Sequence, residues 1–461
     1  MNVKADIIPS KVTFVGEQKT LDLKAICVFA ASGFFLDDDT YYEELKALKP
    51  GHDYELNEDK TKIIKQTPYF KWYYEPRNIS LKQATEEFAH LFESIIQEQA
   101  QNQKVILPLS GGLDSRTQAA ALHHLKNNVY SYSYELKNGH PETSYSKKIA
   151  EVCQFPFKKM VIPENYLWNH IEEAAQLNGC YSEFTHPRQI AVMSEWQNMG
   201  DVFSLGHWGD VLFDDMRVPE NLPFQEQVDM LYKKVLKKNG MYLAELLWKG
   251  WQIEGNFGDY LRDRIETLLR KIDIPHSANA QIRAFKSLYW ATRWTAVNLI
   301  YFEKIKPIKL PYFDNSMCEF VCRIPEEHLA GRQIQIEYLK MRNPNLAKIT
   351  WEDKRPFDLY NYHLNKFPYN FPFRVYQKIK NEVFTKKVVR NNYENQFLGK
   401  ENDLNLKHWL FEKPDFANFV DKNITQEVYH KFTQENHLMY SHTISTLLTL
   451  SLFSSVCQNQ K

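Results

Sequence analysis

The sequence predicts an α/β protein in which a doubly wound parallel sheet carries many added helices and follows a small, mostly β N-terminal domain. Expected strands at 105–109, 129–134 and 158–162 alternate with helical stretches, which is the order of βαβ units. From about residue 165 the pattern becomes helical, with long amphipathic runs at 225–239 and 256–271. We therefore expect a first domain at residues 1–78 and a second at 79–461.

Charge and composition exclude several classes of protein. The 461 residues contain 57 basic and 57 acidic side chains, so no global charge attracts nucleic acid or an anionic membrane. The N-terminus lacks the apolar core of a signal peptide, and the most apolar late stretch, 443–453, is too short and hydroxyl-rich to span a bilayer. Six scattered cysteines suit reduced thiols. We expect a soluble cytoplasmic protein that binds neither nucleic acid nor membrane.

The first 78 residues show mainly strand signals. Residues 24–30 are β-prone, and strands are expected at 53–56 and 62–65 on either side of a turn. Between them, 40–52 is expected to form a short helix that Thr40 caps and Pro50-Gly51 closes. An aromatic linker at 68–76 then leads to a helix that starts at Ser80, with Gln83 in capping-box position.

The strand at 105–109 ends in Ser110-Gly111-Gly112, and a helix is expected to start at Thr117. Backbone N–H groups at such a junction bind anions, and glycines let a phosphate approach the backbone. Ser110 and Ser115 add hydroxyl donors, and Asp114 can hold Mg²⁺ against bound phosphates. The lysine of a Walker loop is absent. An ordinary strand–turn–helix corner would explain the glycines but not the Asp114-Ser115 pair.

A second expected strand, starting at Val202, also ends in glycine-rich sequence with an acid, Asp210. Two carboxylates from separate strand ends suit Mg²⁺, which usually takes one or two protein carboxylates and completes its shell with phosphate and water. The alternative for Asp210 is a capping role in a turn. His207, in the same stretch, can accept a proton near neutral pH, or it can be structural.

Four segments in this order resemble the asparagine synthetases, which are members of the ATP pyrophosphatases. Residues 110–115, Ser-Gly-Gly-Leu-Asp-Ser, resemble their pyrophosphate loop. Residues 204–215 resemble Ser-Gly-Glu-Gly-x-Asp-Glu-Leu-Phe-Gly-Gly, and 307–314 resemble the segment with Arg-Val-Pro-Phe-Leu-Asp, a likeness that Gln335-x-x-Tyr338-Leu339 continues. Residues 351–357 resemble a segment with Lys-x-x-Phe, although an exposed Lys-Arg pair is usually a solvated loop.

The resemblance implies an adenine-nucleotide-hydrolase-like sheet, the cofactors ATP and Mg²⁺, and a set of site residues. Asp114 and Asp210 would be the metal ligands, and Lys354 and His207 the catalytic groups. The implied ATP-binding residues are Leu109, Ser110, Gly111, Gly112, Asp114, Ser115 and Gly206.

The chain departs from the family pattern at three points. His207 replaces a glutamate thought to act on the attacking amine, and Asp214-Asp215 replaces a Gly-Gly pair. The N-terminal part resembles the end of the family's glutaminase domain, but position 2 is Asn2, where that domain has its nucleophilic cysteine. The first cysteine, Cys27, falls inside an expected strand. We therefore expect a remnant without glutaminase activity.

The expected activity is ATP-dependent amide-bond formation. A small-molecule or peptide carboxylate would attack ATP to give an acyl adenylate and pyrophosphate, and ammonia or a substrate amine would take the acyl group. Without a working glutaminase, ammonia would be free or supplied by a partner amidotransferase. One alternative is a nucleotide-binding pseudoenzyme. The other is a tRNA-modifying ATP pyrophosphatase, which needs a basic surface and often paired cysteines that the sequence lacks.

Overall fold

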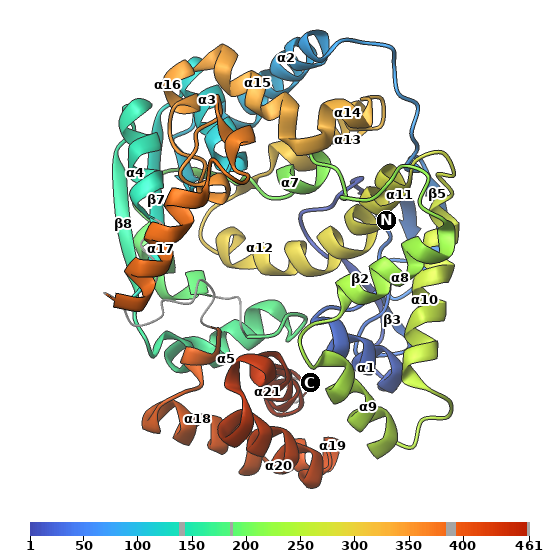
Figure 1. The fold of residues 1–461 in the computed structure, drawn as a ribbon. Coiled ribbons are helices and arrows are strands. Elements are labelled where there is room, and N and C mark those ends of the chain that lie inside the picture. Colours follow the sequence, from blue (N-terminus) through green and yellow to red (C-terminus); the bar gives the residue numbers. More distant parts are fainter. Residues whose placement is uncertain (138–142, 185–187, 384–392, 459–461) are drawn as a thin grey trace.

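The chain contains a five-stranded parallel sheet, whose strands β7 and β8 lie at the left side of the view in Figure 1. The structure, a computed structural model, describes residues 1–137, 143–184, 188–383 and 393–458. The strand order is β10-β9-β6-β7-β8, and every neighbouring pair is parallel. The strands are β6 (Val105–Pro108), β7 (Val129–Leu136), β8 (Phe157–Ile162), β9 (Val202–Ser204) and β10 (Ile308–Lys309). The predicted parallel sheet, with its strands near 105, 129, 158 and 202, is confirmed.

Both faces of the sheet are covered, as a doubly wound fold requires. Successive side chains of a strand point to opposite faces. On one face the Ser133 hydroxyl lies 3.2 Å from Ser146 Oγ of α4 (Thr143–Val152). On the other face the Tyr132 ring packs 5.8 Å from Trp196, which stacks 5.0 Å from Phe302 of α12 (Ala296–Glu303). Apolar strands buried on both sides explain why β6 shows no alternation of polar and apolar residues.

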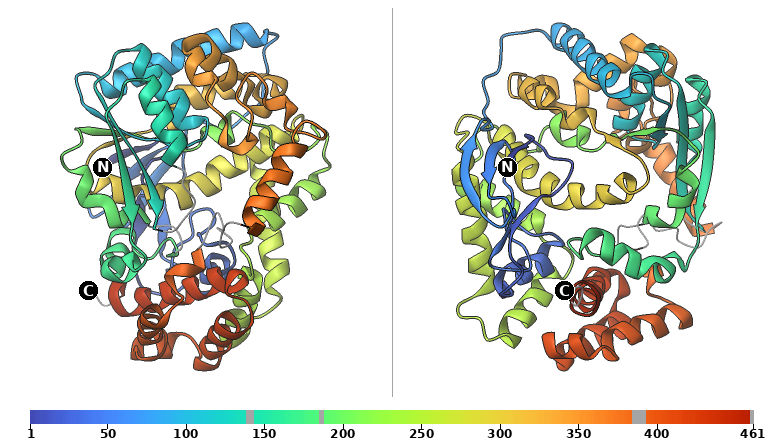
Figure 2. Two further views of the ribbon diagram at one scale, coloured as in Figure 1. Left: turned by 60° about the vertical axis from the view of Figure 1, so that its left-hand side comes forward. Right: turned by 180° about the vertical axis from the view of Figure 1, so that it is seen from behind.

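The second half of the chain is helical, as predicted. The amphipathic run at 256–271 lies in α10 (Phe257–Ile272), and the run at 225–239 forms α8 (Phe224–Val235), which ends four residues earlier than predicted; the capping box at Ser80 starts α2 (Leu81–Ala100). Figures 1 and 2 show the C-terminal helices α18–α21 packed together at the end of the molecule away from α2. Within the described ranges, no helix is both long and apolar enough to cross a bilayer.

The helices around the sheet and in the C-terminal part include α2 (Leu81–Ala100), α3 (Asp114–His124), α5 (Tyr166–Asn178), α7 (Gly209–Leu212), α8 (Phe224–Val235), α9 (Gly240–Gly250), α10 (Phe257–Ile272), α11 (Ala278–Lys286), the π-helical η2 (Ser287–Thr295), α13 (Asn315–Val321), α15 (Gln333–Arg342), α18 (Lys400–Phe411), α19 (Pro414–Phe419), α20 (Lys422–His430) and α21 (His437–Leu452).

The N-terminal region holds two small antiparallel sheets. Its strands are β1 (Asn2–Ala5), β2 (Phe14–Gly16), β3 (Leu45–Ala47), β4 (His52–Leu56) and β5 (Ile63–Pro68), in the orders β1-β4-β5 and β2-β3. The strands predicted at 53–56 and 62–65 are β4 and β5. The strand predicted at 24–30 is wrong, because these residues form the helix α1 (Leu23–Ser32). Asp22 caps its first turn by accepting from the Ala25 N–H group, and Gly33 ends it in a left-handed conformation (φ +78°).

The short helix predicted at 40–52 is also wrong. The Thr40 hydroxyl does not cap a helix but donates to the Leu45 carbonyl at 2.7 Å, and residues 45–47 pair with β2 as β3. The Tyr41 ring stacks on Phe453, with centroids 3.7 Å apart. Burial of these rings against the C-terminal end of the chain outweighs the helix propensity of the segment.

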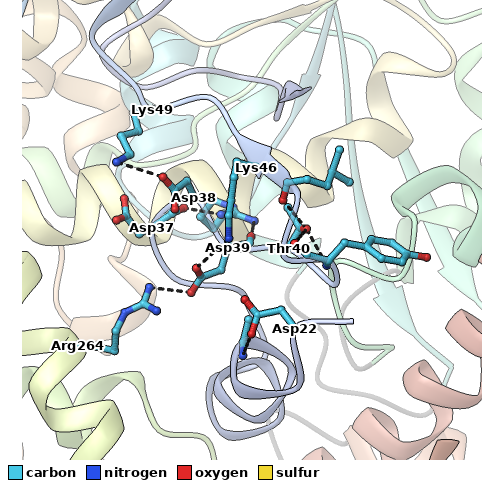
Figure 3. A network of polar contacts seen from close by, with 12 residues as sticks. Asp22, Asp37, Asp38, Asp39, Thr40, Lys46, Lys49 and Arg264 are labelled. Atoms are coloured by element: carbon cyan, nitrogen blue, oxygen red, sulfur yellow. Dashed lines mark hydrogen bonds and ion pairs between the residues drawn. The ribbon is translucent and has the colours of Figure 1, made fainter. Parts of the chain in front are cut away.

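An ion pair between Asp39 and Arg264 joins the N-terminal region to α10, and further pairs lie within the N-terminal region (Figure 3). The Asp39 carboxylate lies 2.7 Å from Arg264 and 4.0 Å from Lys46, and Lys49 lies 3.1 Å from Asp38. Burial raises the pKa of Asp39, while the nearby guanidinium and ammonium oppose that rise. The acidic residues at 37–39 therefore form ion pairs with other parts of the same chain.

Candidate active site

The glycine-rich loop joins β6 to α3. This helix starts at Asp114, three residues before the predicted Thr117, so Asp114 and Ser115 lie in its first turn. The Ser110 N–H group donates to Ser115 Oγ at 3.1 Å, and the two hydroxyl oxygens lie 3.0 Å apart. The Gly112 N–H group donates to Ser110 Oγ at 3.3 Å. Both serines therefore form hydrogen bonds within the loop, and these bonds fix the shape of the loop at the N-terminus of α3.

Asp114 is held by partners from α15 and the turn before it. Its Oδ1 atom accepts from Arg332, with which it forms an ion pair, and from Gln335 Nε2 at 3.0 Å. The same Gln335 amide donates to the Tyr312 hydroxyl at 2.8 Å. Burial raises the pKa of Asp114 to about 6, Arg332 opposes the rise, and the charge of Asp210 adds to it. The charge of Asp210 therefore acts on the Asp114 carboxylate.

A cavity of about 490 Å³ brings the two predicted motifs together. Its lining includes Gly112 and Asp114 from the loop, together with Gly206, His207 and Asp210 from the second motif. The close approach depends on glycine at two positions. A Cβ atom on Gly209 would lie 2.3 Å from Asp114 Oδ1, and one on Gly206 would lie 3.2 Å from the Ser115 nitrogen. Both glycines therefore let α7 and the end of β9 pack against the start of α3.

His207 lies half-buried in the wall of the cavity. Burial lowers its pKa to about 4, although Asp210 opposes that effect, so the imidazole is neutral at pH 7. Its Nδ1 atom is buried and has no hydrogen-bond partner among the described residues. A neutral imidazole can accept a hydrogen bond through one ring nitrogen, and a ligand would reach the buried Nδ1 only after the ring moves.

Lys354 ends a short 3₁₀ turn, and its ammonium lies 5.7 Å from the ring centroid of Trp351. Trp351 and Asp353 line the cavity, whereas Lys354 is not in its lining. The turn packs against the loop, because a Cβ atom on Gly111 would lie 2.4 Å from Glu352 Oε2. Of the predicted residues, the structure thus places Lys354 beside the cavity, and Leu109, Ser110, Gly111 and Ser115 in the loop behind it.

Sequence reasoning missed two arginines that organise this site. Arg116 is fully buried and donates to the carbonyls of Ile349, Thr350 and Gly111 at 2.9, 3.0 and 3.1 Å. Arg332 binds Asp114 from a left-handed position (φ +66°). An available signal was the position of Arg332, three residues before Gln335 in a segment that already resembled a known family. Nothing local to Arg116 indicates its contacts with Ile349 and Thr350, which lie more than 230 residues away along the chain.

Other residues of the resembling segments have structural contacts. Asp314 caps α13 by accepting from the Ser316 N–H group at 2.9 Å. Asp214 accepts from the Gly331 N–H group at 2.8 Å, next to Arg332. The Asp214 carboxylate therefore braces the turn that carries Arg332.

The carboxylates present suit Mg²⁺ only together with phosphate oxygens. No group of three or more His, Cys, Asp or Glu side chains that could hold a metal occurs in the part of the chain that the structure describes. Asp210 is exposed to the cavity, and one oxygen of Asp114 is taken by Arg332 and Gln335. A donor set of one or two carboxylates is the one that Mg²⁺ uses when it bridges a polyphosphate.

Comparisons with known proteins agree with the sequence over the first part of this site. Residues 87–194 match the family model described as asparagine synthase, a segment that includes the glycine-rich loop. Among solved structures, the NMN synthetase from Francisella tularensis is similar at 12% identity and a TM-score of 0.21, over 30% of this chain and 58% of that chain. No curated protein matches the chain in sequence. The predicted likeness to asparagine synthetases is confirmed for residues 87–194, and this match supports an ATP-using synthetase or ligase.

Proposed function

We propose that this chain is an ATP-dependent carbon–nitrogen ligase that adenylates a substrate carboxylate and passes the acyl group to ammonia or an amine. One observation carries the proposal: Gly112, Asp114, Gly206 and Asp210, from two distant segments, line the same cavity, where Arg332 adds a positive charge. A glycine-rich helix N-terminus, paired carboxylates and an arginine are the groups that a metal-bound triphosphate needs.

In the first proposed step, a carboxylate oxygen of the substrate attacks the α-phosphorus of ATP. The new O–P bond gives an acyl adenylate, and the α–β phosphoanhydride bond breaks to release pyrophosphate. Negative charge grows on the departing pyrophosphate. The N–H groups of the loop and the Arg332 guanidinium would stabilise it, because preorganised donors aimed at developing charge are usually the largest catalytic contribution.

Asp114 and Asp210 are the residues that would hold Mg²⁺. When bound, the ion would neutralise charge on the phosphate oxygens. Arg332 already contacts Asp114 and would have to share it with the cation.

In the second proposed step, a nitrogen nucleophile attacks the acyl carbon, and AMP leaves with the electrons of the acyl–phosphate bond. The ammonium of Lys354 would stabilise the oxyanion after a movement of its side chain into the cavity. The neutral His207 would accept a hydrogen bond from the amine and help to take its proton. Ammonia would be free, or a partner amidotransferase would deliver it.

The test measures AMP and pyrophosphate release from Mg·ATP with a panel of carboxylates and amines, and Mg·ATP binding by calorimetry. Asp210→Ala should weaken Mg·ATP binding at least tenfold without unfolding the protein, because Asp210 is exposed. Asp215→Ala is the matched control, since Asp215 is a neighbouring acid outside the cavity lining. Equal Mg·ATP affinity of Asp210→Ala and the wild type would refute the assignment.

One observation favours a second candidate, a nucleotide-binding protein without turnover. The ion pair and hydrogen bond at Asp114 Oδ1 occupy an oxygen that the proposed metal needs. Tight binding of Mg·ATP with no pyrophosphate release across the whole panel would favour this candidate.

A further inference from the structure

Besides the glycine-rich loop (residues 110–115) and the second motif, the cavity lining contains a group of residues with different chemistry, which we call the lysine–tryptophan end. It consists of Lys234 from α8, Lys286 from the end of α11, and the indoles of Trp208, Trp290 and Trp294. Trp290 and Trp294 follow Lys286 at intervals of four along the continuous α11–η2 helix. One helical wall therefore presents a cation and two aromatic rings to the same space.

The two ammonium groups bring positive charge to the cavity, and Asp210 acts on both of them without forming an ion pair. In the described ranges, neither Lys234 nor Lys286 forms a salt bridge, and Lys286 Nζ lies 5.8 Å from the ring centroid of Trp208. Burial first, and then the charge of Lys234, lower the pKa of Lys286 to about 8, while Asp210 opposes the effect. Since both lysines line the same cavity, a bound anion would find favourable Coulomb interactions there.

The rings at this end are held in place by the fold. The Trp290 ring stacks on Phe34 with centroids 5.1 Å apart, and Trp208 Nε1 donates to Ser287 Oγ at 3.1 Å. Fixed indole faces favour a flat ligand, because aromatic groups gain most from offset or edge-to-face contact with other rings.

We infer that the lysine–tryptophan end binds the carboxylate substrate, and that this substrate is a planar aromatic acid with a second anionic group. The inference rests on the proposed function for the adenylation of that substrate. The indole rings would contact the aromatic ring of the substrate, and the lysines would bind its second anionic group. The reacting carboxylate would face the glycine-rich loop. An aliphatic dianion would use the lysines without the rings, and a neutral aromatic acid would use the rings without the lysines.

The experiment uses isophthalate as the probe, with benzoate and glutarate as comparison acids. Isophthalate has a ring and two carboxylates, benzoate has a ring and one carboxylate, and glutarate has two carboxylates without a ring. In ATP–pyrophosphate exchange and in direct calorimetric binding, isophthalate should be favoured at least tenfold over both. A preference for glutarate or benzoate equal to or above that for isophthalate would overturn the inference.

Variants locate the contacts. Lys286→Gln and Lys234→Gln should each weaken isophthalate binding about tenfold while leaving the affinity for Mg·ATP unchanged. Trp290→Leu should weaken isophthalate but not glutarate. Lys233→Gln is the matched control, because Lys233 is an exposed lysine of the same helix outside the cavity. An equal loss of Mg·ATP affinity in the Lys234 and Lys286 variants would assign the lysines to the triphosphate and overturn the inference.

The two readouts separate this inference from the proposed function. Lysine-dependent isophthalate binding without any exchange would support the subsite and count against the ligase reaction. Exchange with other carboxylates that does not depend on Lys234 or Lys286 would support the reaction and overturn the subsite.

Discussion

Replacement of Arg116 by methionine tests how the candidate site is assembled. This fully buried guanidinium connects the glycine-rich loop, through the Gly111 carbonyl, to the Ile349 and Thr350 carbonyls, which lie just before the turn that ends at Lys354. Methionine keeps much of the apolar length of the side chain but donates no hydrogen bond. The three carbonyls would then lose a charged donor in a buried place.

The magnitude follows from two opposing contributions. Three hydrogen bonds to a charged donor contribute roughly 1.5–3 kcal/mol each, or about 6 kcal/mol together. Burial lowers the pKa of Arg116 from 12.5 to about 10, and this shift corresponds to about 3 kcal/mol of desolvation cost that the variant avoids. The net expected loss in the free energy of unfolding is about 3 kcal/mol.

Urea unfolding, followed by tryptophan fluorescence, measures this loss. Arg116→Lys is the control, because it keeps the charge but replaces a planar fork by a single ammonium, and it should recover only part of the stability. Mg·ATP affinity should fall in both variants, since the loop loses its connection to the 349–354 segment. A change of less than about 1 kcal/mol for Arg116→Met would refute the reasoning.

Three further expectations concern other contacts. Gly111→Ala should lower the free energy of unfolding by about 1–3 kcal/mol, because its Cβ atom would lie 2.7 Å from that of Glu352. Adding Glu352→Gly to the same chain should recover part of the loss. Strictly additive effects of the two substitutions in urea unfolding would contradict this. The lowered pKa of His207, from 6.5 to about 4, gives stability that is present above pH 6.5 and lost as the pH falls toward 4. Between pH 7.5 and 5 the wild type should therefore lose about 1–2 kcal/mol more than His207→Gln, and parallel pH profiles would exclude the shift. The Sγ atoms of Cys180 and Cys457 lie 3.6 Å apart. A mild oxidant such as diamide should therefore join them in a disulfide with the loss of two hydrogens, which mass spectrometry of the intact chain measures. The Cys457→Ser variant should not show this loss, and the same loss in the variant would contradict the prediction.

Local patterns predicted the elements that have a strong local cause. The apolar run of β6, the glycines after it and the capping box at Ser80 lie within a few residues of what they determine. The amphipathic runs of α8 and α10 are equally local, since one helical face packs inward.

The errors fall where distant contacts decide the conformation. Residues 25–30 are apolar and buried, and such a run suits a buried strand or a buried helix equally well. Packing of α1 between α9 and the buried Tyr41 region favours the helix. In the same way, the pairing of β3 with β2 overrides the helical pattern after Thr40.

By itself, the sequence predicted the parallel sheet and the glycine-rich loop that follows β6, because each depends on residues close together in the chain. Only the tertiary structure decided which groups share the cavity with them. Arg332, Lys234 and Lys286 come from three separate helical segments; the charge of Arg332 acts on Asp114, and that of Lys234 acts on Lys286. Coulomb interactions and burial depend on distance in the folded molecule, which the order of residues does not state.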